Sequence, residues 1–178
     1  MTVEHIRKNA AACRALYGTS EPGEILKNRN VRVKRISLGG LRGMICNIGG
    51  DNFAFSDVAQ SPSLERVLLA KLLGHTVLHR EELALGRSFE ESYIPRAKSL
   101  SEKEVSFFAA ELLITDTTIL ELCSYGYTEG QLAAALGGMR ELVSYKLFSM
   151  RSRGIAVGQD VWRGDFLKRC DIDILQNG

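Results

Sequence analysis

The sequence predicts an α+β fold in which a small antiparallel sheet packs on a bundle of helices. Short β-rich runs separated by glycine turns lie between Val31 and Asp57, a pattern typical of hairpins. Apolar residues at helical spacing dominate much of the remaining chain, and one helix over about 61–79 is apolar nearly all round. We therefore expect a single domain over 1–178, with the sheet and central helices within 30–125 and a helical end over 128–154.

The first predicted element is an amphipathic helix near the N-terminus. Ile6, Ala10 and Cys13 share one face of this helix, and Gly18 suits its end. The sheet follows in the runs VRVKRISL, GMICNI and NFAFSD. Gly39-Gly40 separates the first two runs and Gly49-Gly50 the last two, so we expect hairpin turns at both places.

The central helix has a clear start in the sequence. Ser61 is placed to cap the free backbone N–H groups, and Pro62 suits the first helical position. The apolar residues that follow predict a helix that runs to about His79. Because they cover nearly its whole circumference, this helix should lie buried at the centre of the fold.

The chain after this helix is predicted as a loop followed by four helices. Residues 87–98 show no period and should form a surface loop. Ser101 opens S-E-K-E, a capping box in which Glu104 would bond back to the serine. A short helix should then extend from about Asp116 to Ser124.

The C-terminal part contains a second capping box. Thr128 opens T-E-G-Q, and the segment breaks at two glycines before a further helix that should stop at Gly154. From Ile155 onward, a tail with Trp162 and Phe166 is expected to fold back as a strand or a short helix.

Composition restricts the class of protein. The chain has 23 basic and 21 acidic residues, so its net charge of +2 favours neither nucleic acid nor an anionic membrane as a partner without a local patch. No signal peptide and no membrane-spanning run is evident, so a cytoplasmic location is expected. The cysteines form no C-x-x-C pair, which makes buried thiols the expected state of Cys13, Cys46, Cys123 and Cys170.

The central helix carries a pattern close to a zinc-peptidase motif. In H-E-x-x-H, two histidines hold the metal on one helix face and the glutamate acts as general base. The stretch LLAKLLGHTVLH has Lys71 and Leu72 where the first histidine and the glutamate would stand, and it keeps His75.

Two motifs together resemble the ImmA/IrrE family of zinc peptidases. That family has R-x-x-L-A-H-E-x-G-H-x-x-L-H on one helix and E-A-N-x-F-A-x-E-L-L on a later one. This chain reads RVLLAKLLGHTVLH and EVSFFAAELL, with a small sheet and GLRGM before them. The resemblance covers roughly 31–153 and implies a zincin-like fold.

The resemblance implies that the chemistry of the site has been lost. In the family, the two motif histidines and the glutamate that opens the second motif bind zinc; His75 and Glu104 match two of these ligands. Lys71 replaces the first ligand, and an ammonium has no lone pair to give. Leu72 replaces the general base. Because a catalytic zinc normally has three protein ligands, we expect a pseudo-peptidase without a cofactor.

Two arrangements of the lysine remain open from the sequence. In the first, the Lys71 ammonium occupies the metal position and pairs with Glu104, so that neither charge is buried alone. In the second, Lys71 extends to solvent and Glu104 caps its own helix.

A displaced metal site is an alternative. His75 and His79 are four residues apart, a spacing at which helices chelate metals, and Glu104 or a cysteine would complete a zinc site. The chain would then be an active peptidase that cleaves a helix-turn-helix repressor. Other carboxylates, Glu111 and the pair Glu81-Glu82, are expected to be solvated, as is His5.

A second alternative is direct binding to DNA by residues 128–154. QLAAALGGMRELVSYKL has the outline of a helix-turn-helix with a glycine in the turn. The basic residues on or beyond its second helix would contact phosphates: Arg140, Lys146, Arg151 and Arg153.

The resemblance also implies a biological role. Intact family members act in mobile elements and stress responses, where they cut a helix-turn-helix repressor. With the catalytic residues replaced, we expect this chain to bind a repressor-like regulatory protein in the former substrate cleft, without cutting it.

Overall fold

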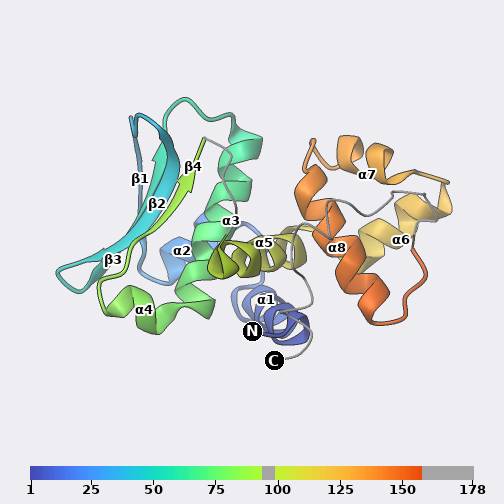
Figure 1. Ribbon diagram of the computed structural model, residues 1–178, viewed down its shortest axis with the longest axis horizontal. Coiled ribbons are helices and arrows are strands. Elements are labelled where there is room, and N and C mark those ends of the chain that lie inside the picture. The colour runs from blue at the N-terminus through green and yellow to red at the C-terminus, as the bar shows by residue number, and fades with distance from the viewer. Residues whose placement is uncertain (94–98, 158–178) are drawn as a thin grey trace.

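The computed structural model describes residues 1–93 and 99–157, and over these residues the chain has an α+β fold. Figure 1 shows a sheet with α2, α3 and α4 on one side of the molecule, and α6, α7 and α8 on the other. Helices α1 and α5 lie between these two groups. One continuous apolar core runs through both groups.

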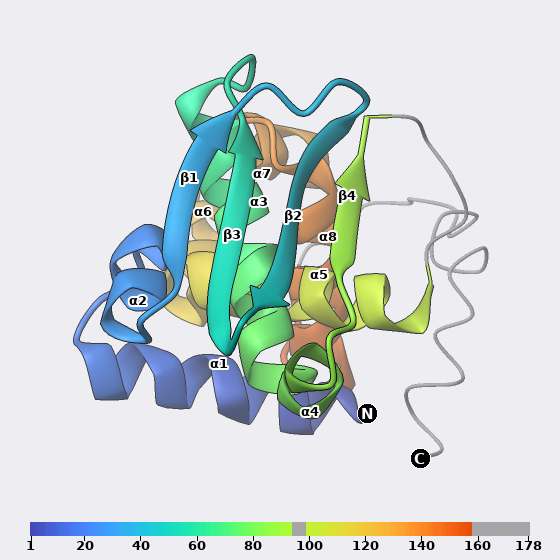
Figure 2. The ribbon, with the colours of Figure 1, turned by 90° about the vertical axis from the view of Figure 1, so that its left-hand side faces the viewer.

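The sheet has four strands in the order β1-β3-β2-β4: β1 Arg32–Ile36, β2 Leu41–Ile48, β3 Asp51–Asp57 and β4 Phe89–Ser92. Strand β2 is antiparallel to both β3 and β4, whereas β1 is parallel to β3. The prediction of a purely antiparallel sheet is therefore wrong, and so is the hairpin expected at Gly39-Gly40, because β1 and β2 are not neighbours in the sheet. The chain leaves β1, crosses to β2, and returns as β3 in the gap between them (Figure 2).

The hairpin between β2 and β3 turns on two glycines. Gly49 and Gly50 both have positive φ, at 62° and 93°, as a two-residue type I′ turn requires. The Asn47 side chain accepts a hydrogen bond from the Gly50 N–H at 3.1 Å. This prediction of a hairpin is confirmed.

Helix α3, Pro62–Leu78, is the central helix that the sequence predicts, and the Ser61 side chain caps it. It packs on α5, Leu100–Leu113, and on the inner face of the sheet (Figures 1 and 2). Gly74 makes the contact with α5 possible, because a Cβ there would lie 3.0 Å from the Val105 side chain.

Helix α5 starts two residues earlier than its predicted capping box. Ser99 caps the helix and Glu102 bonds back to it, so the expected box of Ser101 and Glu104 is wrong. The sequence SLSEKE contains the S-x-x-E spacing twice, and spacing alone does not choose between the two. Glu104 is buried and bonded elsewhere, so it is not available to cap.

The remaining helices agree with the sequence in most places. The C-cap Gly18, the short helix to Ser124 and the capping box at Thr128 are confirmed. Helices α2 and α4 were not predicted, and neither was β4, which lies in the expected loop. The bounds are α1 Val3–Tyr17, α2 Pro22–Asn28, α4 Arg80–Ala84, α6 Asp116–Ser124, α7 Glu129–Ala135 and α8 Arg140–Ser152.

The predictions for the C-terminal tail, for membrane spans and for the cysteines concern residues that are only partly within 1–93 and 99–157. Trp162, Phe166 and Cys170 lie outside the described residues. Within the described ranges no helix is long and apolar enough to cross a membrane. Cys13, Cys46 and Cys123 are free thiols; Cys13 is buried and the other two are partly exposed.

Candidate functional site

The residues that match the metal ligands and their neighbours in the resemblance, which we call the former metal position, lie on α3 and α5 and beside β4. Helix α3 supplies Lys71 and His75, and His79 follows at its C-cap. Helix α5 supplies Glu104, and β4 supplies Glu91. Lys71, His75, His79 and Glu104 each expose less than a tenth of their surface. A site built from buried charges and imidazoles must satisfy its polar atoms internally.

Lys71 pairs with Glu91 and not with Glu104. Its ammonium lies 3.2 Å from Oε2 of Glu91, and the two side chains are 9% and 13% exposed. Both sequence hypotheses for Lys71 are therefore wrong: the expected partner is different, and the side chain does not extend to solvent. The reason is β4, because this unpredicted strand brings a carboxylate beside α3.

The ion pair keeps the lysine charged. Burial lowers the pKa of Lys71, but the carboxylates of Glu91 and Glu141 outweigh it and raise the pKa above its ordinary value. A protonated amine offers donors only, so Lys71 gives no lone pair to a metal. The neighbouring Leu72 is fully buried and carries no group that accepts a proton.

His75, His79 and Glu104 form a chain of hydrogen bonds. Nδ1 of His75 lies 3.0 Å from Nδ1 of His79, and Nε2 of His79 lies 2.8 Å from Oε2 of Glu104. The other carboxylate oxygen accepts a bond from the amino group of Met1 at 2.7 Å. The structure thus brings together the three residues of the hypothetical displaced metal site.

In this arrangement both ring nitrogens of His79 and both carboxylate oxygens of Glu104 are engaged in hydrogen bonds. The two Nδ1 atoms lie within hydrogen-bond distance of each other, so one of them donates and the other accepts. Over residues 1–93 and 99–157, no three His, Cys, Asp or Glu side chains are grouped to hold a metal ion.

Burial and neighbouring charges determine whether His75 and Glu104 are charged. Burial, followed by the charges of His79, Lys71 and Arg87, lowers the pKa of His75 to about 2, so its imidazole is neutral. The Phe89 ring stacks on it with the centroids 4.0 Å apart. Burial raises the pKa of Glu104, but hydrogen bonds from His79 and the Met1 amino group together have the larger, opposite effect. The net result is a lowered pKa, so the carboxylate stays ionised.

The other carboxylates and His5 take structural or surface roles. Glu111 was expected to be solvated, but it is buried and its Oε2 accepts from Lys146 at 2.7 Å, so that expectation is wrong. Glu81 is exposed, and Glu82 pairs with Arg87. His5 is exposed on α1, as predicted.

The basic residues of the expected DNA-binding segment are not all at the surface. Lys146 is 1% exposed and lies 2.6 Å from Oδ1 of Asp116. Arg153 forms two hydrogen bonds with the same carboxylate, at 2.7 and 3.0 Å. Only Arg140 and Arg151 are exposed, and α8 is buried along most of its length. Lys146 is therefore a core residue and the prediction that it contacts phosphate is wrong.

Glu91 is the residue of the site that the sequence analysis missed. Its strand has only four residues, F-E-E-S, and the apolar residue at its start is the one inward-facing signal. Alternation over four residues is too short to separate a strand from a loop.

No model of a known protein family matches this chain, and no curated protein matches it significantly.

Proposed function

We propose that this chain is a catalytically inactive relative of the ImmA/IrrE zinc peptidases, with a zincin-like fold, that regulates gene expression by binding a repressor-like protein. The observation that carries the proposal is the buried Lys71–Glu91 pair. It lies at the position that the resemblance assigns to the first zinc ligand, and the neighbouring Leu72 takes the place of the base. Leu72 accepts no proton from a water molecule, and the Lys71 ammonium has no lone pair for a metal, which supports the loss of catalysis.

The sheet supports a way of holding a protein partner. Strand β4 is the last strand in the sheet order and carries Glu91 next to the former metal position. An edge strand presents backbone groups with which an extended segment of a partner pairs. A repressor segment bound along β4 would pass over the Lys71–Glu91 pair without being cut.

The first experiment restores the missing residues. We expect the double substitution Lys71→His with Leu72→Glu to bind one zinc ion per chain, measured by metal analysis after purification without chelator. Adding His75→Ala to this variant should abolish the binding, and Leu72→Glu alone should bind none. A folded double variant that takes up no zinc would contradict the resemblance.

The second experiment tests the partner. The wild-type chain should recover a helix-turn-helix protein from an extract of its own organism, and it should prevent that protein from shifting DNA in a gel. Reversing the charge of the exposed β4 residue, by Glu90→Lys, should weaken recovery. Lys8→Glu, on the exposed face of α1, is the matched control and should not. Recovery without a transcription factor would remove the regulatory part of the proposal.

A zinc peptidase with a displaced site is the second candidate, because His75, His79 and Glu104 are in contact. Metal binding would require the bond between the two Nδ1 atoms to break. Stoichiometric zinc in the wild-type chain that is lost in His75→Ala, together with cleavage of a repressor, would favour this candidate.

A further inference from the structure

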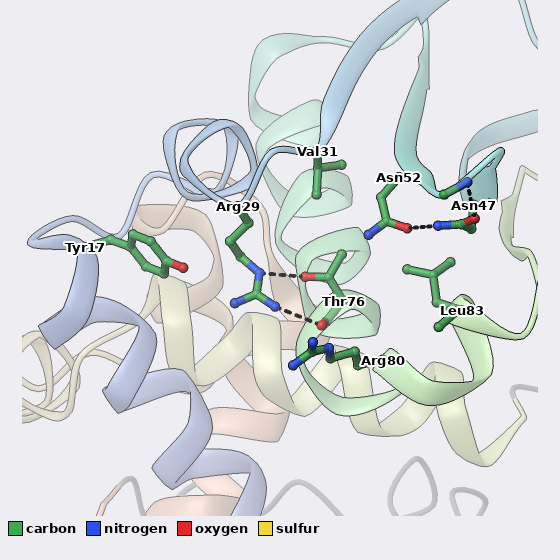
Figure 3. Close-up of a pocket in the computed structure, with 10 residues that line it drawn as sticks. Tyr17, Arg29, Val31, Asn47, Asn52, Thr76, Arg80 and Leu83 are labelled. Atoms are coloured by element: carbon green, nitrogen blue, oxygen red, sulfur yellow. Dashed lines mark hydrogen bonds between the residues drawn. The ribbon is translucent and has the colours of Figure 1, made fainter.

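A pocket of about 420 Å³ lies away from the former metal position. It is enclosed by the end of α1, the end of α2, the β2–β3 hairpin, the last turn of α3, and α4 (Figure 3). Thr76 lines it from α3, and with about 100° per residue this side chain lies roughly 140° round the helix from Lys71. The volume is within the range of about 300–1,000 Å³ typical of small-molecule sites.

Arg29 is held in place at the pocket wall. Its Nε donates to Thr76 Oγ1 at 3.2 Å and its Nη2 donates to the Thr76 carbonyl at 2.9 Å (Figure 3). Thr76 is itself buried, and its hydroxyl donates to the Leu73 carbonyl at 2.8 Å. These bonds use two of the five N–H donors of the guanidinium and leave three for a ligand.

Asn52 is also oriented by its neighbours. Its Oδ1 accepts a hydrogen bond from the Asn47 amide at 2.9 Å, and Asn47 in turn accepts from the Gly50 N–H. The Asn52 amide nitrogen therefore points away from Asn47 and toward the side of the pocket where Arg29 lies (Figure 3). Arg80 follows Thr76 by four residues and also lines the pocket (Figure 3).

The charge of the pocket is not balanced by the protein. No acidic residue lines it, and in the described part of the chain no carboxylate lies within 4.0 Å of the Arg29 or Arg80 guanidinium. Two guanidinium groups match the charge of about −1.5 to −2 on a phosphate monoester near neutral pH. Their planar donor sets suit phosphate oxygens better than an ammonium would. Val31 and Leu83 add an apolar wall beside these donors.

We propose that this pocket binds a small organic phosphate, with Arg29, Arg80 and Asn52 on the phosphate and Val31 and Leu83 against the organic part. The site is separate from the Lys71–Glu91 pair and does not depend on the function proposed above. It gives the chain a place at which a small molecule could bind independently of a protein partner.

The test is a titration followed by the backbone amide signals in NMR spectra. Inorganic phosphate and phenyl phosphate are the probes, with sodium chloride at equal ionic strength as the reference. We expect saturable shifts at Gly50, Asn52, Thr76 and Arg80, and tighter binding of phenyl phosphate than of inorganic phosphate. Arg80→Ala should weaken binding at least tenfold, and Asn52→Ala gives a second variant if the first does not fold.

Arg140→Ala is the matched control, because it removes one exposed arginine from a helix outside the pocket. It should leave the affinity unchanged. The proposal is overturned if no saturable shift appears at the pocket residues. Equal weakening by Arg80→Ala and Arg140→Ala would also overturn it, since that result reports only non-specific charge. If phenyl phosphate binds no more tightly than inorganic phosphate, the apolar wall has no role in recognition and the organic part of the proposal fails.

Discussion

At the scale of single residues, the main feature is the ion pair between Lys71, which is buried, and Glu91, which is 13% exposed. Lys71 Nζ has one carboxylate contact, at 3.2 Å, and Oε1 of Glu91 has no hydrogen-bond partner among the described residues. A buried pair with an unsatisfied oxygen is weak as a source of stability, because the desolvation of both groups offsets their attraction. We therefore expect the pair to contribute little net stability to the fold, although it keeps two opposite charges at this position.

This balance predicts an asymmetric response to mutation. Glu91→Leu removes the carboxylate nearest to the buried Lys71 ammonium and should lower the free energy of unfolding by about 3 kcal/mol. The double variant Lys71→Met with Glu91→Leu removes both charges and should recover most of that loss. Urea unfolding of the wild type, Lys71→Met, Glu91→Leu and the double variant measures the cycle. Additive losses in the double variant would contradict the prediction.

His75 predicts a pH dependence of stability. Its pKa is about 2 in the folded chain and about 6.5 when unfolded, so below pH 6.5 the unfolded chain takes up a proton that the folded chain does not. This residue should therefore cost about 2 kcal/mol of unfolding free energy as the pH falls from 7 to 5.

The comparison of wild type with His75→Gln isolates this effect. Urea unfolding at each pH gives the free energy of unfolding of both proteins. Between pH 7 and pH 5 the wild type should lose about 2 kcal/mol more of this free energy than the variant. Glu104 does not interfere, because its lowered pKa places its own loss of stability at pH values below the unfolded value of about 4.5. Parallel curves for the two proteins would show that His75 titrates normally in the fold.

At the scale of elements, helix α5 shows how two equal spacings are separated by their surroundings. The Ser99 hydroxyl accepts from the Glu102 N–H at 3.2 Å, and Glu102 accepts from the Ser99 N–H at 2.7 Å. Glu104, the glutamate of the alternative box, is 5% exposed and bonded to His79. The helix starts where its glutamate is free to cap.

We predict that the two serines differ in their effect on stability. Ser99→Ala removes the cap and should cost about 1 kcal/mol. Ser101→Ala is the matched control at the same helix end and should change stability by less than about 0.5 kcal/mol. Thermal unfolding of both variants checks this. A larger loss from Ser101→Ala would mean that the helix starts later.

At the scale of the whole molecule, one buried cation joins three helices. Lys146 of α8 lies 2.7 Å from Glu111 of α5 and 2.6 Å from Asp116 of α6. Arg153, just after α8, holds the second oxygen of Asp116. Hydrogen bonds from Arg153 and the neighbouring Lys146 ammonium lower the pKa of Asp116. Burial acts in the opposite direction, but its effect is smaller. This network fastens the helical group of α6 and α8 to α5, which also packs on α3.

Lys146→Met should therefore destabilise the whole chain. The substitution removes the ammonium that lies 2.7 Å from the buried Glu111 carboxylate, so we expect a loss of about 3 kcal/mol. Arg140→Ala, on the exposed start of α8, is the control and should change stability by less than about 0.5 kcal/mol. Chemical unfolding monitored by circular dichroism gives both values. An unchanged Lys146→Met variant would mean that this contact does not hold α8 to α5.

Local sequence determined the elements whose signals are contained within a few residues. Ser61 with Pro62 set the start of α3, the glycines at 49 and 50 set a type I′ turn, and the apolar circumference of 61–79 made a buried helix. The sequence also determined that Lys71 and Leu72 occupy a buried helix face. Each of these follows from backbone geometry or from side-chain polarity at one place in the chain.

Only the tertiary structure decided which distant groups meet. A four-residue strand brings Glu91 to Lys71, β3 inserts between β1 and β2 and makes the sheet mixed, and Lys146 turns into the core toward Glu111. Charge pairing and strand order depend on contacts between residues far apart in the chain, so local spacing does not encode them. A buried lysine takes whichever carboxylate the fold places beside it, because the cost of an unpaired charge exceeds any local preference.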